Sequence, residues 1–296
     1  GLVAAVGLAG LSGAILAAGG LPGRADARLL AEEAAVRQRL PLQAVCNIEE
    51  GRDLPPAAAC TTPPDGPAEV IVWGNSHAAH LTPAILDWTS GNGLRMRQVT
   101  RSGCLPLLGS ADGLADTDCL AFNAAVVAEM GQGPRPRLVL LGAAWTVILA
   151  RSPGGDGTEV QALERDLAAT VRRLRAVVGA ETGIVLLGDT PDFRFAPAAC
   201  HARRRFLGMD TGLCDLAPPA QAATASTIDA LLNRVAAAEP GVHVFRPADA
   251  FCRAGRCRTR SSEGPWYADS HHLTPAGGRA QADALAGVLD AASVAR

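Results

Sequence analysis

Short apolar runs alternate with amphipathic segments along most of the chain. The runs at 69–73, 138–141, 183–188 and 242–245 are rich in Val, Leu and Ile and predict buried strands, and residues 95–100 predict a further strand. Helical periodicity predicts a helix from the first run to about residue 90, and others at 119–130, 159–178, 220–238 and 275–289. Continuous apolar strands alternating with helices favour an α/β fold, in which helices cover both faces of a parallel sheet.

The first 20 residues carry no charge and are close to the length that spans a bilayer as a helix. We expect the last helix of a truncated membrane protein here, with a signal remnant or a buried Ala-rich helix as alternatives. The chain begins with Gly1 rather than Met, so we expect its true start to be missing or processed. Residues 24–40 predict a connecting helix, and the Pro- and Ala-rich stretch 55–67 predicts a surface loop. The expected division is 1–20, transmembrane helix; 21–66, connecting helix and linker; and 67–296, the main domain.

Composition excludes several classes of protein. Of the 296 residues, 48% are hydrophobic and 19% charged, and the net charge is −2. These values argue against wholesale disorder and against a basic nucleic-acid-binding surface, so no nucleic-acid partner is expected.

Eight cysteines form an even set without a Cys-x-x-Cys spacing. Metal binding therefore lacks its usual spacing, and buried free thiols in a cytosolic protein are the alternative. Disulfides in an oxidising compartment are favoured. Of 105 possible connectivities we predict the simplest, in which sequence neighbours pair: Cys46 with Cys60, Cys104 with Cys119, Cys200 with Cys214, and Cys252 with Cys257.

Two motifs contain residues suited to nucleophilic catalysis. Trp73-Gly74-Asn75-Ser76-His77 follows a predicted strand, where a serine on a tight turn exposes its hydroxyl; alternatively, Ser76 only caps the next helix. Asp269-Ser270-His271-His272 precedes a helix that Thr274 can cap, and this spacing can place a carboxylate beside an imidazole. Alone, the His-His pair is equally a chance metal site or a polar loop. Together, in the order Ser, Asp, His, the motifs indicate a serine nucleophile with its base and orienting acid.

Gly74-Asn75-Ser76-His77-Ala78 and Asp269-x-x-His272-Leu-Thr-x-x-Gly277 resemble the SGNH-hydrolase domain fused to membrane acyltransferase-3 proteins, which O-acetylate bacterial surface polysaccharides. Further matches are Arg101-Ser-Gly-Cys104-Leu-Pro106, the 138–141 strand followed by Trp145, and Phe251-Cys252 with Cys257. The resemblance covers about residue 70 to the end. It implies a three-layer, flavodoxin-like fold, and it identifies residues 1–20 with the last helix of a missing acyltransferase-3 membrane domain.

The resemblance also assigns roles. Ser76 is the nucleophile, His272 the general base and Asp269 its partner, while the N–H groups of Ser76 and Gly103 form an oxyanion hole. His271 is a rival for the base. Asn75 stands where such proteins usually carry Asp. Asn is uncharged, so this chain lacks any electrostatic effect that the Asp has in those proteins. Gly142-Ala-Ala-Trp145 stands where ordinary SGNH esterases have Gly-x-Asn-Asp, so the side-chain oxyanion donor is unassigned.

Four other aromatic rings have no firm role. Trp145 is either a wall of the sugar site or a core residue. His80 is expected on a helix surface, and His201, in a loop with Arg203-Arg-Arg205, is expected to be solvated rather than to meet an anionic glycan. His243 lies in a strand and is expected to be structural.

The first functional hypothesis is a periplasmic domain tethered to the inner membrane. It would pass an acyl group, above all acetyl, from Ser76 to a hydroxyl of a polysaccharide or lipid-linked glycan. The resemblance implies acetyl-CoA as the ultimate donor, used by the membrane domain, with no cofactor or metal in this domain. The alternatives are an esterase that uses water as acceptor, and a silent glycan-binding module in which Asn75 marks a decayed site.

Overall fold

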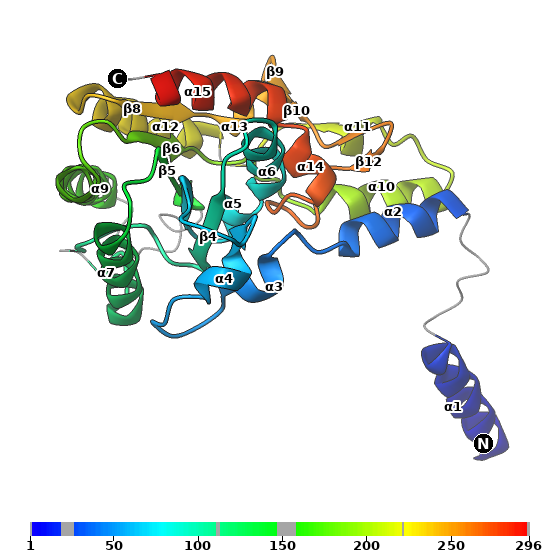
Figure 1. The fold of residues 1–296 in the computed structure, drawn as a ribbon. Helices are drawn as coiled ribbons and strands as arrows, with labels where there is room; N and C mark the ends of the chain where they lie inside the picture. The colour runs from blue at the N-terminus through cyan, green and yellow to red at the C-terminus, as the bar shows by residue number, and fades with distance from the viewer. Residues whose placement is uncertain (1, 19–26, 111–112, 147–157, 221, 295–296) are drawn as a thin grey trace.

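A parallel sheet forms the centre of the molecule. The computed structural model describes residues 2–18, 27–110, 113–146, 158–220 and 222–294 (Figure 1). The strands are paired in the order β1-β4-β3-β5-β6-β8, all parallel, and β2 pairs antiparallel with β4. Without the two short strands, this is the flavodoxin-like order 2-1-3-4-5. Their bounds are β1 (Asn47–Ile48), β2 (Thr61–Thr62), β3 (Val70–Gly74), β4 (Met96–Arg101), β5 (Leu138–Gly142), β6 (Gly183–Leu187) and β8 (Val242–Phe245).

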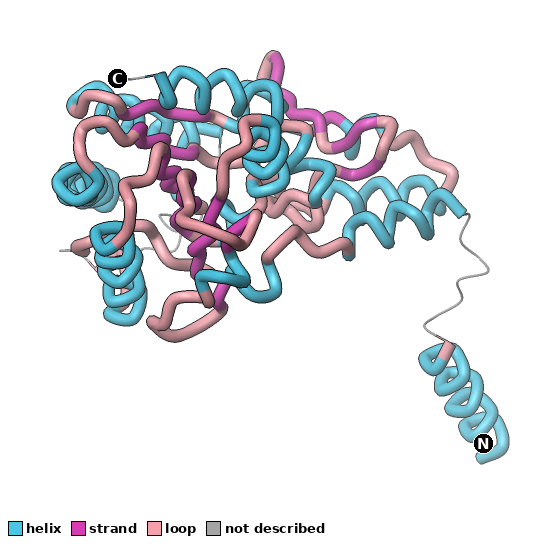
Figure 2. The backbone as a smooth tube through the Cα atoms, in the orientation of Figure 1, coloured by secondary structure: helices cyan, strands magenta, loops and turns pink. Residues whose placement is uncertain are grey.

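Helices cover both faces of this sheet (Figure 2). Alternate strand residues face opposite sides, so Ile71 and Trp73 pack with one set of helices and Val70 and Val72 with the other. This confirms the three-layer α/β prediction. The first set is α7 (Thr117–Gln132), α9 (Thr158–Val178) and α12 (Ala222–Ala238); the second is α6 (Thr82–Gly91) and α15 (Ala282–Val294).

Two predicted helices are each divided in two. The segment after β3 forms α5 (Ser76–Ala79) and then α6, and the C-terminal segment forms α14 (Pro275–Arg279) and then α15. Helix α14 lies very close to its neighbours: a Cβ on Gly277 would lie 2.0 Å from Trp266 O, and one on Gly278 would lie 2.5 Å from His80 O. This approach brings the Asp-His motif, which directly precedes α14, next to α5.

The sheet extends into the segment expected to be a linker. Strands β1 and β2 both pair with β4, and two short helices, α3 (Gln43–Cys46) and α4 (Ala57–Cys60), precede them. The prediction of a plain surface loop over 55–67 was wrong, because Cys60 is buried in a disulfide and Thr61 begins a strand. The expected boundary between 66 and 67 therefore cuts through one sheet.

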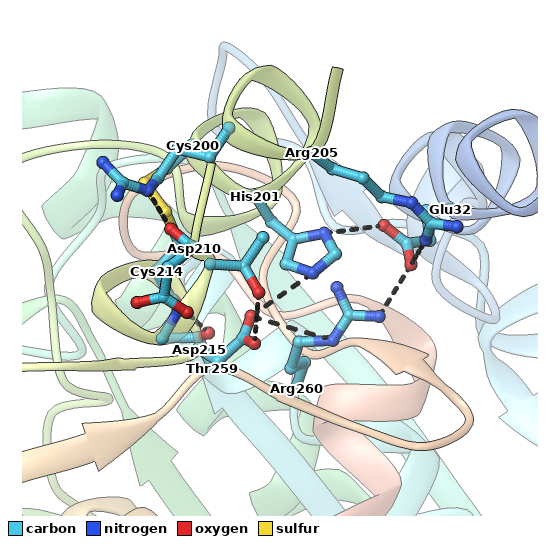
Figure 3. A network of polar contacts seen from close by, with 12 residues as sticks. Glu32, Cys200, His201, Arg205, Asp210, Cys214, Asp215, Thr259 and Arg260 are labelled. Atoms are coloured by element: carbon cyan, nitrogen blue, oxygen red, sulfur yellow. Dashed lines mark hydrogen bonds and ion pairs between the residues drawn. A yellow bond between two sulfur atoms is a disulfide. The ribbon is translucent and has the colours of Figure 1, made fainter. Parts of the chain in front are cut away.

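Helix α2 (Ala27–Arg37) packs against α10 (Pro197–Phe206) through a buried carboxylate, Glu32 (Figure 3). Glu32 lies 3.0 Å from His201 Nδ1 and accepts a hydrogen bond of 2.7 Å from Arg260 Nη2. His201 also approaches Asp215, at 3.6 Å. The prediction that His201 lies in a solvated loop was wrong: it is a buried helical residue between two carboxylates.

All eight cysteines form disulfides, in the sequential pairing that the sequence predicts. Two of the bridges tie short elements near the C-terminal half of the chain. The elements of this part of the chain not yet named are α11 (Gly212–Asp215), β7 (Leu216–Ala217), α13 (Pro247–Phe251), β9 (Cys252–Arg253), β10 (Arg256–Arg258), β11 (Arg260–Ser261) and β12 (Gly264–Pro265).

Helix α1 (Leu2–Ala17) forms where a membrane span is predicted. Over the described residues, no helix has both the length and the apolar character needed to cross a membrane. The transmembrane assignment of 1–20 stays a prediction.

Candidate active site

Ser76 lies at the carboxyl end of β3, where the strand order reverses and where ligands bind in open α/β sheets. It is the first residue of α5, and Asn75 caps this helix by accepting a hydrogen bond of 2.9 Å from His77 N–H. Gly74 has φ +148°, and a Cβ there would lie 1.8 Å from Gly142 O. Only glycine lets β3 turn this close to β5, so the turn that presents Ser76 depends on Gly74.

The structure brings Ser76, His272 and Asp269 into one chain of hydrogen bonds. Ser76 Oγ lies 2.9 Å from His272 Nε2, and His272 Nδ1 lies 2.7 Å from Asp269 Oδ2. Both distances lie within the reach expected of a nucleophile, a base and an orienting acid. Of the two rival histidines, His272 is the one that faces Ser76.

Asp269 is held as a carboxylate. Its Oδ1 accepts hydrogen bonds of 2.8 and 2.7 Å from the backbone N–H groups of His271 and His272. Desolvation alone raises the pKa of Asp269, but these two bonds and the bond from the His272 ring outweigh it and hold the pKa well below its usual range. An ionised Asp269 fixes the proton of His272 on Nδ1, which leaves Nε2 free to accept the Ser76 proton.

His271 pairs with His77 rather than with Ser76. Its Nδ1 lies 2.9 Å from His77 Nε2. His77 is buried, and desolvation, then the electrostatic interaction with the neighbouring imidazoles of His80, His272 and His271, lower its pKa well below the usual range. The ring nitrogens that His77, His271 and His272 offer lie within 4.8 Å of one another, and within the described ranges this is the one group of potential metal ligands.

His80 is buried beneath the site, so its predicted position on a helix surface was wrong. Its Nδ1 accepts a hydrogen bond of 3.3 Å from Leu273 N–H, so Nε2 carries the proton and donates to Thr190 Oγ1 at 2.9 Å. Desolvation lowers the pKa of His80 well below the usual range. A neutral His80 therefore joins α5 to the backbone directly after His272. The sequence did hold a signal for this position, because His80 is four residues after Ser76 and residues four apart lie on the same face of a helix.

A cleft of about 680 Å³ opens over Ser76 and His272. Gly103 and Asn75 line it, as expected of residues near the acyl group. Its other wall comes from the segment expected to be a linker, which sequence reasoning did not connect with the site. The lining residues of that segment are Val36, Arg37, Gln38, Arg39, Leu40, Gln43, Ala44, Asn47 and Glu49.

Trp145 is a core residue, so of its two expected roles the one as a wall of the sugar site was wrong. Its side chain is fully buried, and Nε1 donates a hydrogen bond of 2.8 Å to Leu187 O. The neighbouring Ala144, not Trp145, lines the cleft. A buried indole with its one donor satisfied has no contact to offer a sugar.

Asn123, on α7, holds the loop that carries Gly103. Its Oδ1 accepts a hydrogen bond of 2.8 Å from Trp73 Nε1, and its Nδ2 donates to Leu105 O and Leu107 O at 2.7 and 2.8 Å. The Cys104–Cys119 disulfide joins the same loop to the same helix. Sequence reasoning missed Asn123, since one Asn in an amphipathic helix gives no signal of what it contacts.

A family model for the SGNH domain (fused to AT3 domains) matches residues 45–287. This range covers most of the chain, so the protein belongs to this family, in agreement with the resemblance seen in the two motifs.

One solved structure supports the same fold. The periplasmic domain of a lipopolysaccharide acetyltransferase from Salmonella ser. Paratyphi A superposes with a TM-score of 0.60 at 17% identity, covering 86% of this chain and 92% of that one. A carbohydrate acetylesterase family member from Sinorhizobium meliloti gives a TM-score of 0.46 at 15% identity, over 75% and 97% of the two chains. A search of curated proteins gives no match.

Proposed function

We propose that this chain is the acyl-transferring domain of an O-acyltransferase, with Ser76 as the nucleophile that carries the acyl group. The observation that supports this most is the unbroken chain from Ser76 Oγ through His272 to Asp269, at 2.9 and 2.7 Å. Such a chain lets an otherwise weak hydroxyl attack a carbonyl carbon.

In the first step, Ser76 Oγ attacks the acyl carbonyl while its proton passes to His272 Nε2. His272 then gives this proton to the leaving group of the donor as the acyl–donor bond breaks. In the second step, a hydroxyl of the acceptor gives its proton to His272 and attacks the Ser76 ester. Return of the proton to Ser76 Oγ restores the enzyme. The two steps transfer only the acyl group and protons, so they need no redox partner and no metal ion.

The N–H groups of Ser76 and Gly103 are proposed to hold the oxyanion. The Ser76 N–H is in the first turn of α5, where backbone donors lack partners within the helix, and Gly103 lines the same cleft. Asn47, which also lines the cleft, donates its Nδ2 to Ser102 Oγ at 2.8 Å and so fixes the residue next to Gly103.

Asn75 does not argue for a decayed site. Its side chain caps α5 through Oδ1, and an Asp at this position has an equivalent oxygen for the same hydrogen bond. The geometry of Ser76, His272 and Asp269 is intact beside it.

The proposed acceptor is a hydroxyl of a cell-surface polysaccharide or a lipid-linked glycan, and the proposed acyl group is acetyl. Membership of the family fused to AT3 domains supports a membrane acyltransferase-3 partner, acetyl-CoA as the ultimate donor, and a location in the periplasm at the inner membrane. The similarity in fold to a lipopolysaccharide acetyltransferase periplasmic domain is consistent with this.

The test separates transfer from hydrolysis. Purified protein is given p-nitrophenyl acetate with and without a de-O-acetylated bacterial surface polysaccharide, and acetyl groups on the polysaccharide are counted by mass spectrometry. We expect the polysaccharide to gain acetyl groups at the expense of free acetate, and Ser76→Ala to abolish both products, while Ser90→Ala, an exposed serine on α6, changes neither.

Release of acetate alone, unaffected by the polysaccharide, would make the protein an esterase. Polysaccharide binding with no turnover in the wild-type protein would make it a binding module.

A further inference from the structure

Three histidines from two separate segments meet in the lining of the cleft. His77 comes from α5, and His271 and His272 come from the loop before α14. His77 Nε2 lies 2.9 Å from His271 Nδ1, and the ring centroids of His77 and His272 are 5.2 Å apart. Two imidazole nitrogens this close must share a proton, and a metal ion can take the place of that proton.

The spacing suits a tetrahedral zinc site. Zinc binds imidazole nitrogen at about 2.0–2.1 Å, which places two nitrogens of one tetrahedral site about 3.3 Å apart. The three nitrogens of this cluster already lie within 4.8 Å of one another. His271 and His272 are only partly buried, so their rings have room to turn toward a shared ion.

The surroundings also suit a bound metal. Asp269 accepts the Nδ1 proton of His272 at 2.7 Å, which is the carboxylate–histidine arrangement that orients metal ligands and raises their basicity. His272 Nε2, the nitrogen left free, is also the atom 2.9 Å from Ser76 Oγ. Three imidazoles leave a fourth position of a tetrahedral site open to water or another ligand.

We propose that His77, His271 and His272 form a binding site for Zn²⁺, and that the bound ion inhibits the enzyme. The His272 Nε2 lone pair cannot bind Zn²⁺ and accept the Ser76 proton at the same time, so the metal-bound form has no general base. The inhibition rests on the proposed function, whereas the binding does not.

Calorimetric titration of tag-free protein with ZnCl₂ measures binding without any turnover. We expect one ion per chain, and Co²⁺ in its place should give the visible absorption of a tetrahedral complex. His271→Ala removes one ligand and should weaken binding at least about 100-fold, the upper end of the cost of losing even an outer-shell partner. His243→Ala, on β8, is the matched control and should bind as the wild type does.

Labelling of Ser76 by a fluorophosphonate then reports inhibition. One equivalent of Zn²⁺ should block labelling of the wild type, and EDTA should restore it; in His271→Ala, Zn²⁺ should have little effect relative to that variant's own zinc-free rate. If His271→Ala does not fold, His271→Asn replaces it as the variant that lacks this imidazole ligand.

Binding of equal strength in the wild type and the His271 variants would overturn the proposed site, as would no binding at all. If Zn²⁺ binds as expected but the zinc-free wild type is not labelled, the proposed function fails and the metal site stands.

Discussion

Single residues set the charge states on which the site depends. Asp269 is ionised through three hydrogen bonds, whereas His77 and His80 are neutral through burial. The base therefore has a fixed carboxylate on one side and uncharged rings on the other. No lysine occurs in the sequence, so all fixed positive charge near the cleft comes from arginine.

Asp189, just after β6, has a raised pKa, in contrast to the lowered pKa of Asp269. One oxygen accepts a hydrogen bond from Thr146 N–H at 3.1 Å, and among the described residues the other has no partner. Burial, with a further contribution from nearby Asp229, raises the pKa of Asp189 to about 8. Between pH 4 and 8 the folded protein therefore binds a proton that the unfolded chain has lost, so stability falls as pH rises.

Asp189→Asn should remove this pH dependence, because an amide keeps the acceptor for Thr146 and does not titrate. The gain in unfolding free energy over the wild type should grow from near zero at pH 4 to as much as about 5 kcal/mol at pH 8, taking about 1.4 kcal/mol per pH unit. Urea unfolding at a series of pH values, with disulfides intact, measures it. A gain that does not change with pH would show that Asp189 does not titrate in this range.

At the scale of elements, close approach between β3 and β5 fixes the position of Ser76. We expect Gly74→Ala to abolish folding or to cost more than about 4 kcal/mol, since its Cβ would lie 1.8 Å from Gly142 O. Gly93→Ala is the control: φ there is +66°, with nothing within 4 Å of the added atom, so it should cost only about 1–2 kcal/mol. Chemical denaturation compares the two, and equal costs would contradict the packing explanation.

The main strands and helices could be predicted from the sequence because their apolar runs are continuous and bounded by polar residues. Ser76 could be placed at the carboxyl end of a strand. Asp269 and His272 could be joined to it because their spacing, the order Ser, Asp, His and the resemblance to the SGNH domain fit a nucleophile with its base and orienting acid. The cleft wall from residue 36 to 49 could not be predicted, since it consists of a short helix, a two-residue strand and loops without periodicity. His80 was misplaced because one helical turn does not show which side is buried. His201 was misplaced because the three arginines after it suggest a solvated segment, whereas its carboxylate partners, Glu32 and Asp215, come from elsewhere in the chain.

At the scale of the whole molecule, Glu32 ties α2 to the main domain. Its side chain is only 11% exposed, and its carboxylate also contacts Arg28, at 3.2 Å, and Arg205, at 3.7 Å. Burial raises its pKa, but hydrogen bonds and charge from Arg260 and His201 outweigh this and lower it below the usual range. Because α2 leads directly into the cleft wall, this cluster (Figure 3) also holds one side of the site.

Glu32→Ala should release α2 while the sheet stays folded, because it leaves Arg260 and His201 without their shared carboxylate. Losing a buried ion pair costs about 3 kcal/mol, so amide exchange over 27–46 should become about 100-fold faster, with β3 and β5 unchanged. Hydrogen–deuterium exchange measures this. Glu33→Ala, whose exposed side chain pairs with Arg37, is the control and should change little. Equal exchange in both variants would mean that Glu32 does not hold the helix.

The central claim is that Ser76 is an activated nucleophile, and labelling of the metal-free protein with a fluorophosphonate tests it most directly, because this reagent reacts with an activated serine whatever the natural acceptor is. Peptide mapping should find the label on Ser76 in the wild type and should find none in Ser76→Ala. In His272→Ala the rate should fall by several orders of magnitude, and in Asp269→Asn it should fall by about 10⁴ if the wrong tautomer costs what it does in serine proteases. A folded wild-type protein that is not labelled, or is labelled equally fast without His272, would contradict the claim.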